Sequence, residues 1–309
     1  MKHFTLDTQS QFEEKNLSLA IGNFDGFHKG HIAILNQLKK IATKNNQLSA
    51  ILSFDPHPRK FFDKKNENFN IYSKIDKIKF LKKFNVDIYI EFKFDNKLSK
   101  LSAYNFVEKI LLNKLDIKNL VVGKDFKFGK DRAGNYKILE NYSSKKNFST
   151  YVVDAMMLTD GSEKYSSSII RENIKNGEFE KANFALGRPW HITGKIVQGD
   201  KRARQINFPT ANMIPGDHIL PRKGVYCIEA YFKNKKHLGI SNFGKRPTVD
   251  GSKLLLETHI FDFNEEIYGN DLTVHFLTFI RPEQKFVNFD ELTNQIKKDI
   301  EVAKKYHKI

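Results

Sequence analysis

Two closely spaced histidines are the residues of this sequence best suited to phosphate chemistry. The segment Gly22–His31 reads G-N-F-D-G-F-H-K-G-H, and His28 and His31 lie three positions apart. On the first turn of a helix these two side chains share a face. Gly30 between them leaves the backbone open to a phosphate, and a helix N-terminus offers free N–H groups and the positive end of the helix dipole. An imidazole pair beside such an anion site indicates phosphoryl or nucleotidyl transfer.

Two simpler interpretations of these histidines stay open at this point. They could cap the helix or face solvent, because short motifs often occur by chance. They could bind zinc, although histidines at this spacing with no third His or Cys nearby make a poor ligand set. The surrounding elements favour phosphate, since the apolar run Leu17–Ile21 predicts a strand before the loop and the pattern from Ile32 predicts a helix after it.

The length and composition fit a chain with two domains. It has 309 residues, of which 40% are hydrophobic, enough for a core in each domain. We find no charged-then-apolar leader and no apolar run of about eighteen residues, so we expect a cytoplasmic protein. The single cysteine, Cys227, cannot form an internal disulfide, which agrees with a reducing compartment.

The formal net charge of +16 would attract nucleic acid, membranes or any other polyanion. The lysines are spread along the whole chain, however, and no zinc ligands or aromatic RNA-binding signature accompany them. We therefore expect small-molecule partners, with no specific nucleic acid and no membrane. A basic nucleic-acid-binding protein stays open as the alternative from a different class, and a clustered Lys/Arg face would favour it.

The first half of the chain alternates short apolar runs with helical patterns, which predicts an α/β fold with a parallel sheet covered on both faces. Ligands of such sheets bind at the carboxyl ends of the strands. The predicted strands are 17–24, 48–54, 86–92, 120–123 and 151–154, and the predicted helices are 32–41, 75–84, 103–115, 136–142, 169–176 and 179–186.

The pattern changes at Gly187-Arg188-Pro189, and we place a domain boundary there, giving domains 1–186 and 187–309. Beyond it, extended runs separated by Gly, Pro, Asn and Asp predict an antiparallel barrel or closed sheet. These strands are 192–197, 225–232, 237–241, 254–261 and 272–280. One helix ends the chain, with Asn288 as its cap and with an apolar face of Leu292, Ile296, Ile300 and Val302.

Three further stretches of the first half follow predicted strands: Asp55–Arg59, Gly123–Gly129 and Ser166–Arg171. Serines that open a helix offer hydroxyl and backbone donors to phosphate, and Arg171 adds a planar cation nearby. Taken alone, each stretch is also explained as a helix cap or a turn.

Together with Gly22–His31, these stretches resemble the FAD synthetase (FMN adenylyltransferase) domain of the bacterial bifunctional riboflavin biosynthesis protein family, within the wider H-x-G-H nucleotidyltransferase group with its Rossmann-like fold. The family patterns G-x-F-D-G-x-H-x-G-H, G-x-D-F-x-F-G and S-S-T/S-x-I-R are met at 22–31, 123–129 and 166–171. The resemblance implies transfer of AMP from ATP to FMN, with release of pyrophosphate.

By the same resemblance, His28 and His31 are catalytic and stabilise the charge on the transferring phosphate. The implied nucleotide-binding residues are Gly22, Asn23, Phe24, Gly30, Asp125, Ser167, Ser168 and Arg171. The aromatic pair Phe126 and Phe128 would help to shape the flavin pocket.

The second domain carries Gly199–Arg204 and then Phe208–Asn212, which ends in P-T-A-N. A Thr hydroxyl and an Asn amide oxygen two residues apart present oxygen ligands of the kind that Mg²⁺ accepts beside substrate phosphates. Without its context this segment is more simply a turn leading into a strand.

The segment is followed by Gly224-Val225-Tyr226, Asn242–Thr248 and Leu256–His259, and together they resemble riboflavin kinase. The resemblance implies a six-stranded antiparallel β-barrel. It implies that Gly199, Thr210 and Asn212 bind the nucleotide, with Mg²⁺ held at Thr210 and Asn212, and that Glu257 is the general base for the ribityl hydroxyl. Arg281 and Phe286 would border the flavin.

The chain departs from the family where Ala203 and Asn207 replace two glycines in the loop before P-T-A-N. Alanine disfavours a positive φ, so closure of that loop over ATP could suffer. The sequence thus predicts a bifunctional enzyme with riboflavin, FMN and ATP as substrates, FAD as product and Mg²⁺ accompanying ATP. The alternatives are an FAD synthetase with an impaired kinase domain and an adenylyltransferase for another phosphorylated acceptor.

Overall fold

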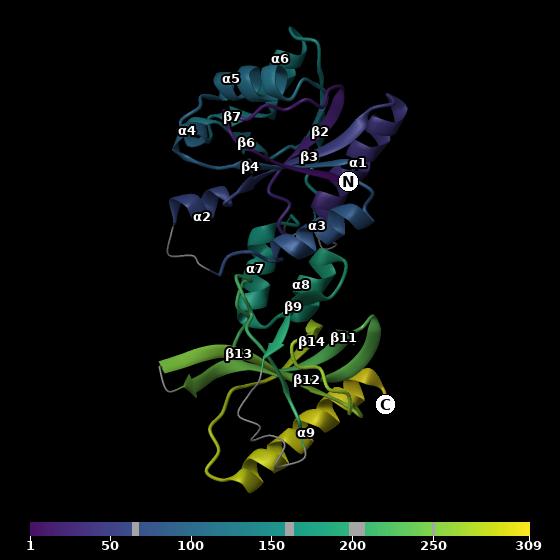
Figure 1. Cartoon of the computed structure of the whole chain (residues 1–309), viewed down its shortest axis with the longest axis vertical. Coiled ribbons are helices and arrows are strands. Elements are labelled where there is room, and N and C mark those ends of the chain that lie inside the picture. The colour runs from purple at the N-terminus through teal and green to yellow at the C-terminus, as the bar shows by residue number, and fades with distance from the viewer. Residues whose placement is uncertain (64–67, 158–163, 198–207, 249–250) are drawn as a thin grey trace. The chain divides into compact units, whose positions relative to one another are not determined.

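The computed structural model describes residues 1–63, 68–157, 164–197, 208–248 and 251–309. They form two compact units (Figure 1), one from Met1–Glu67 and Lys74–Ser166, the other from Asn68–Ser73 and Ser167–Ile309. Gly199, Ala203 and Asn207, in the predicted loop before P-T-A-N, lie outside the described residues.

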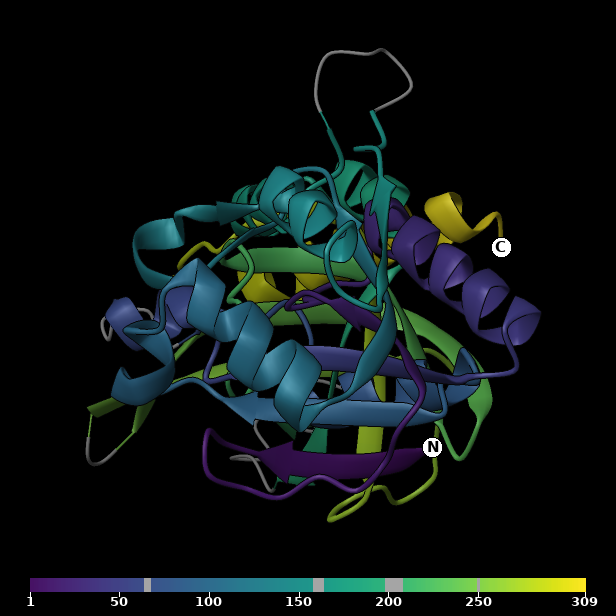
Figure 2. The same cartoon turned by 90° about the horizontal axis from the view of Figure 1, so that it is seen from above.

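The first unit is built on a parallel sheet with the strand order β1-β4-β3-β2-β5-β8. Its strands are β1 (Lys2–Leu6), β2 (Leu17–Ile21), β3 (Leu48–Asp55), β4 (Ile88–Lys93), β5 (Ile117–Gly123) and β8 (Ser149–Val153). Every strand except β1 overlaps a run that the sequence predicts as a strand. The sheet confirms the predicted α/β fold. β1, dark purple at the sheet edge in Figure 2, escapes prediction because K-H-F-T-L is short and largely exposed.

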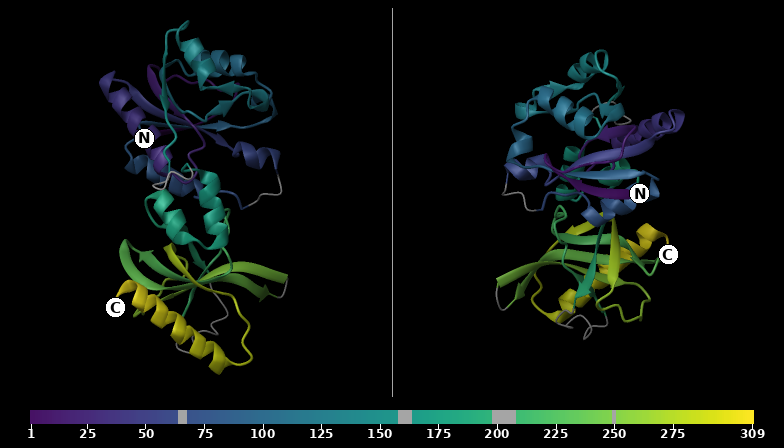
Figure 3. Two further views of the ribbon diagram at one scale, coloured as in Figure 1. Left: turned by 180° about the vertical axis from the view of Figure 1, so that it is seen from behind. Right: turned by 45° about the horizontal axis from the view of Figure 1, so that its top comes forward.

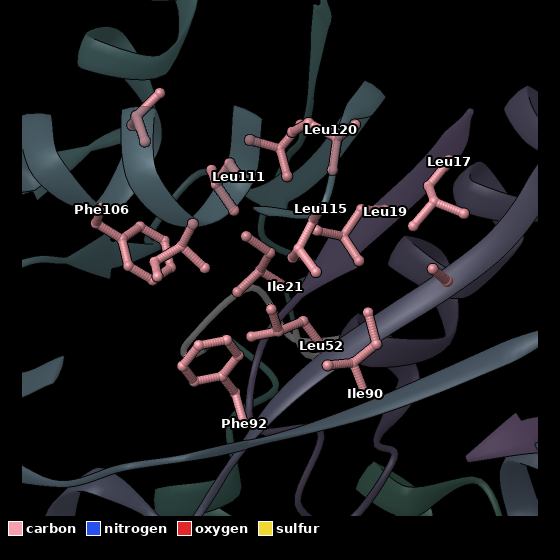
Figure 4. Packing of buried hydrophobic residues seen from close by; sticks show 14 of the residues in the cluster. Leu17, Leu19, Ile21, Leu52, Ile90, Phe92, Phe106, Leu111, Leu115 and Leu120 are labelled. Carbon is pink, nitrogen blue, oxygen red and sulfur yellow. The ribbon is translucent and has the colours of Figure 1, made fainter. Parts of the chain in front are cut away.

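Alternate residues of the central strand β2 face opposite sides of the sheet, as a pleated strand requires. Leu17, Leu19 and Ile21 belong to the buried cluster drawn in Figure 4, which packs under the helical segment that follows Ser102. Ala20 belongs to the cluster on the other face, which contains side chains of α1 (Lys29–Lys44) and α3 (Lys74–Lys83). Both faces are therefore covered, as expected for a parallel sheet.

The predicted helix 103–115 is only briefly an α-helix. α5 covers Ala103–Asn105, and Phe106–Lys114 form a π-helix whose hydrogen bonds reach five residues back. At its end, the N–H of Leu115 donates to the carbonyl of Ile110 at 3.0 Å. Over so few turns, α- and π-helices bury nearly the same residues, so the apolar pattern does not distinguish them.

Short elements connect the strands of this unit. They are α2 (Pro58–Phe62), α4 (Asn96–Ser99), β6 (Lys127–Phe128), a 3-10 turn (Lys130–Arg132), β7 (Gly134–Asn135) and α6 (Tyr136–Ser143). The sequence predicts only α6 among them, because the others are too short for a periodic pattern.

The second unit is a closed antiparallel barrel with the strand order β10-β13-β12-β11-β14-β9. Its strands are β9 (Trp190–Val197), β10 (Ala211–Met213), β11 (Gly224–Phe232), β12 (Lys235–Thr248), β13 (Gly251–Ile260) and β14 (Asp271–Pro282). The six-stranded barrel is confirmed. Its shortest strand, β10, is part of the P-T-A-N segment and is too short to show an alternating pattern.

The helices α7 (Ser167–Asn176) and α8 (Phe179–Leu186) belong to the compact unit of the barrel, although the predicted boundary follows them. Phe179 stacks on Phe276 of β14 with ring centroids 5.1 Å apart. The indole N–H of Trp190 donates to the carbonyl of Ile71 at 2.8 Å, which ties residues 68–73 to the same unit.

The last helix, α9 (Phe289–His307), lies along the barrel and is yellow in Figure 3. Asn288 caps it as predicted, accepting a hydrogen bond from the N–H of Glu291 at 2.9 Å. Ile296 and Ile300 pack on the barrel, but Val302 is 50% exposed and Ala303 is buried in its place. The inward positions therefore follow the true helical period better than the predicted face did. Among the described residues, no helix is long and apolar enough to cross a membrane.

Candidate active sites

The histidine motif lies where β2 ends and α1 begins, at a carboxyl end of the sheet. The N–H of Gly22 donates to the carbonyl of Leu52 at 3.1 Å, which continues the sheet by one residue. His28 is the N-cap of α1, and its Nδ1 accepts from the N–H of His31 at 3.3 Å. The helix-cap interpretation is therefore correct for His28, and capping places its ring at the N-terminus of the helix, where an anion would bind.

The two imidazole rings are stacked. Their centroids lie 3.7 Å apart with an angle of 22° between the planes, and the ring of Phe24 lies 5.2 Å from that of His31. His28 is only 6% exposed. The pair is thus a packed, preorganised group, which agrees with the predicted shared face.

Gly30 is required by this packing. A Cβ atom added there would lie 3.1 Å from Cε1 and Nδ1 of His28 and 3.8 Å from the carbonyl oxygen of Tyr165. The sequence assigns this glycine to phosphate approach, and the structure adds a second reason, because a Cβ atom would force the His28 ring to shift by a few tenths of an ångström.

The loop between β2 and α1 has an unusual backbone. Phe24, Gly26 and Phe27 all have positive φ, at 48°, 94° and 42°. Such conformations are strained for phenylalanine and persist only where the surroundings enforce them. Phe24, a predicted nucleotide-binding residue, and Phe27 are each only 1% exposed, so both residues are packed into the interior beneath the site.

A polar cluster lies beneath this loop. The ammonium of Lys77 on α3 donates to the carbonyl of Asn23 at 3.0 Å, and Asp25 is buried. Burial lowers the pKa of Lys77, while the charges of Asp25, Glu91 and Asp55 oppose that shift. Sequence reasoning missed Lys77 and Glu91, although a glutamate inside the apolar run of β4 was a visible signal.

Asp55 and Glu91 form part of the same cluster at the ends of β3 and β4. Burial raises the pKa of Asp55, and the charge of Glu91 adds to the shift. Glu91 is itself buried and pairs with the ammonium of Lys74 at 2.5 Å. The ends of these two strands therefore carry an exposed carboxylate and a buried one side by side, as expected for a ligand-binding edge.

The segment 123–129 begins where β5 ends. The carboxylate of Asp125 is largely exposed and pairs with Lys164 at 2.6 Å. The rings of Phe126 and Phe128 are stacked at 5.5 Å, but Phe128 is only 6% exposed and packs 5.6 Å from Phe106 in the core. The structure thus places Phe128 as a support for Phe126.

Ser167 and Ser168 open α7, as predicted, and belong to the second compact unit. Arg171 lies on the same helix and is 7% exposed. Its Nε donates to the carbonyl of Phe69 at 2.9 Å, and its guanidinium lies 3.8 Å from the centre of the Phe69 ring. These contacts fix the orientation of the cation.

The barrel carries a pocket of about 480 Å³ beside the P-T-A-N segment. Thr210 and Ala211 line it, together with Thr258 and residues 263–268. Asn212 is buried on β10, and its strand position is paired with Glu257 on β13. Thr210, Asn212 and Glu257, three of the predicted kinase residues, therefore gather on neighbouring strands.

Glu257 lies on β13, which pairs with β10 on one side and with β12 on the other. Its partner on β12 is Asn242, whose Nδ2 donates to Glu257 Oε2 at 3.4 Å. Two residues further along β13, His259 Nδ1 lies 3.0 Å from the carbonyl of Pro209. This contact ties β13 to the P-T-A-N segment. Burial lowers the pKa of His259. The sequence indicates Asn242 only as a member of the motif at 242–248. The structure adds its contact with Glu257, the predicted base.

Arg281 makes a two-pronged ion pair with Asp299 of α9. Its Nε and Nη2 donate to the two carboxylate oxygens, each at 2.8 Å, and Asp299 is 2% exposed. The guanidinium also lies 5.8 Å from the centre of the Phe286 ring. The two residues predicted to border the flavin are thus neighbours, and Arg281 also anchors the last helix.

Comparisons with known proteins cover both sites. The family model for FAD synthetase matches residues 10–169, and the model for riboflavin kinase matches residues 186–307. The bifunctional riboflavin kinase/FMN adenylyltransferase of Haemophilus influenzae is 40% identical over 290 residues, which cover 94% of each chain. The protein of the same name from Escherichia coli K12 is 34% identical over 298 residues, covering 96% of this chain and 95% of its own.

A crystal structure from Streptococcus pneumoniae, named as a macrolide-efflux protein, has the same fold. It is 28% identical, with a TM-score of 0.88, and the match covers 98% of this chain and 99% of the other. That name describes the other protein, and what it shows here is the fold. Because both family models match in the predicted order and relatives of one name align over nearly the whole chain, the chain belongs to the bifunctional riboflavin kinase/FMN adenylyltransferase family.

Proposed function

We propose that this chain phosphorylates riboflavin to FMN with ATP in its C-terminal domain and adenylylates FMN to FAD with ATP in its N-terminal domain. The observation that carries the proposal is the stacked His28–His31 pair at the start of α1, in a chain that matches both family models. We place the catalytic domains at 1–186 and 187–309. The matched family spans, which end at 169 and begin at 186, support this division.

In adenylyl transfer, an oxygen of the FMN phosphate attacks the α-phosphorus of ATP, and the bond from that phosphorus to the bridging oxygen of pyrophosphate breaks. His28 and His31, with the N–H groups at the start of α1, stabilise the negative charge on the transferring phosphate. Their packed geometry supports this role, because preorganised donors need no rearrangement during the reaction.

Other residues bind the nucleotide and the flavin. Asn23 Oδ1 is a buried oxygen with no hydrogen-bond partner among the described residues, so it suits a donor such as a ribose hydroxyl. Ser167, Ser168 and Arg171 hold the departing phosphates. The remaining nucleotide and flavin contacts are Gly22, Phe24, Gly30, Asp125 and Phe126, and Phe128 helps to shape the flavin pocket by supporting Phe126.

In the kinase reaction, the ribityl hydroxyl of riboflavin attacks the γ-phosphorus of ATP, and the bond to the bridging oxygen of ADP breaks. Glu257 takes the proton of that hydroxyl. Thr210 and Asn212 bind the nucleotide beside the barrel pocket, where Gly199 would join them, and Arg281 and Phe286 border the flavin.

The oxygen donors on and beside the P-T-A-N segment fit Mg²⁺. The hydroxyl of Thr210 and the amide of Asn212 offer oxygen, with the carboxylate of Glu257 on the adjacent strand. Mg²⁺ prefers such ligands and shares its shell with substrate phosphates. When bound, the ion supplies charge neutralisation at the phosphates, and Thr210 and Asn212 would hold it. We place the enzyme in the cytoplasm, with small-molecule substrates and no specific nucleic acid or membrane partner.

The test is a chromatographic time course of purified protein with riboflavin, ATP and Mg²⁺, beside a parallel reaction that starts from FMN. We expect FMN to appear first and FAD to follow. FAD formed only from supplied FMN would indicate a disabled kinase and would point to the loop with Ala203 and Asn207 as the cause. No product from either substrate would overturn the proposal and favour another phosphorylated acceptor.

A further inference from the structure

Helix α3 contacts the strained loop of the histidine motif at two points. Lys77 donates to the carbonyl of Asn23 at 3.0 Å, and the ring of Phe80 stacks on that of Phe27 at 4.2 Å. Residues three apart share a helix face, so one face of α3 braces both ends of the loop. His28 follows Phe27 directly in the chain.

The hydrogen bond from Lys77 reaches the loop just before its first residue with a strained backbone. Its acceptor, the carbonyl of Asn23, belongs to the peptide that enters Phe24, the first residue with positive φ. A backbone conformation of this kind persists only when its surroundings enforce it. A charged donor makes a stronger hydrogen bond to a carbonyl than a neutral donor does.

The charge of Lys77 is matched by its surroundings. Asp25, Glu91 and Asp55 all favour the charged ammonium of Lys77, which is half-buried. Asp25 lies in the same loop and is 4% exposed. The acidic groups around Lys77 offset the cost of partly burying its ammonium, because burial of a charge is otherwise unfavourable.

We propose that Lys77 is a positioning residue for adenylyl transfer, holding the Gly22–Phe27 loop, and through it the His28–His31 pair, in the geometry that the reaction requires. This inference rests on the proposed function of the N-terminal site. Lys77 does not need to touch the substrate. Loss of its bond would let the loop relax and shift the imidazoles.

The test compares Lys77→Met, Lys77→Arg and the control Lys79→Met, an exposed lysine on the same helix. We expect Lys77→Met to lower kcat for FAD formation from FMN by about 10²-fold, the effect of a misplacement of about 1 Å. KM for ATP should change little, because the loss falls on the transition state. Lys77→Arg should restore much of the rate, and Lys79→Met should match the wild type.

FMN formation from riboflavin, measured in the same preparations, reports that the rest of the chain is intact. If Lys77→Met fails to fold, Lys77→Gln, which keeps a neutral donor, takes its place and should lie between Met and Arg. Unchanged kcat in a variant whose melting temperature alone falls would overturn the positioning role. A wild-type protein that forms no FAD would overturn the proposed function instead, and the inference with it.

Discussion

The packing of single side chains decides whether the histidine pair can work, and Gly30 is the sharpest case. A methyl group at this position would sit 3.1 Å from the His28 ring, so the ring would have to shift by a few tenths of an ångström. We expect Gly30→Ala to lower the rate of FAD formation by about 10-fold, because His28 would shift by less than the 1 Å that costs about 10²-fold. Assays that start from FMN would measure the loss.

FMN formation is the control for that variant, since Gly30 lies in the unit that does not contain the barrel. An FAD-forming rate equal to that of the wild type would show that the His28 ring can move without consequence. Loss of both activities would indicate misfolding of the whole chain.

Among single residues, the sequence identifies those whose type and motif indicate a chemical role. It misses those whose role depends on contacts with residues remote in the chain. His28, His31 and Glu257 are recognisable by type and motif. Lys77 is one lysine among many, and only its bond to the Asn23 carbonyl and the charge of the buried Asp25 distinguish it. No local pattern carries that information, because the contact joins residues 54 positions apart.

Among the helices and strands, the last helix is attached to the barrel by a buried ion pair. The ion pair between Arg281 on β14 and Asp299 on α9 is bidentate, and Asp299 is almost fully buried. Removing one partner leaves an uncompensated buried charge, so we expect Arg281→Met to lower the free energy of unfolding by about 3–5 kcal/mol. Trp190, the single tryptophan, is buried in the barrel unit, and its fluorescence during urea unfolding measures the change.

Replacing both partners, in Arg281→Met with Asp299→Leu, should recover much of that loss, because no buried charge remains. Lys181→Met, which removes an exposed pair with Glu178, should change stability by less than about 1 kcal/mol. Unaltered stability of Arg281→Met with loss of FMN formation would assign Arg281 to the flavin alone.

The elements themselves show what periodicity can predict. Strands β2 to β5 are buried runs of apolar residues, and the sequence places them well. β1 and β10 are missed as strands because one is an exposed edge and the other is three residues long, so both depend on pairing with strands remote in sequence. The π-helix at Phe106–Lys114 escapes for a related reason, since only its hydrogen bonds distinguish it.

For the whole molecule, the two activities are proposed to reside in separate domains, and this has a consequence that mixed variants can test. His31→Ala removes a proposed stabiliser of the transferring phosphate and should lower FAD formation by about 10²–10³-fold while FMN formation continues. Glu257→Gln removes the proposed general base and should lower FMN formation by about 10²–10⁴-fold while FAD still forms from FMN. Neither variant alone should convert riboflavin efficiently to FAD.

Mixed together, the two variants should restore that conversion, because FMN made by the His31→Ala protein can diffuse to the intact adenylyltransferase site of the Glu257→Gln protein. We expect FAD to appear after a lag that shortens as the total protein concentration rises. The double variant His31→Ala/Glu257→Gln is the matched control and should form neither product efficiently. If each variant performs its own reaction but the mixture yields no FAD, released FMN does not reach the second site, and the two domains must then act on FMN within one molecule.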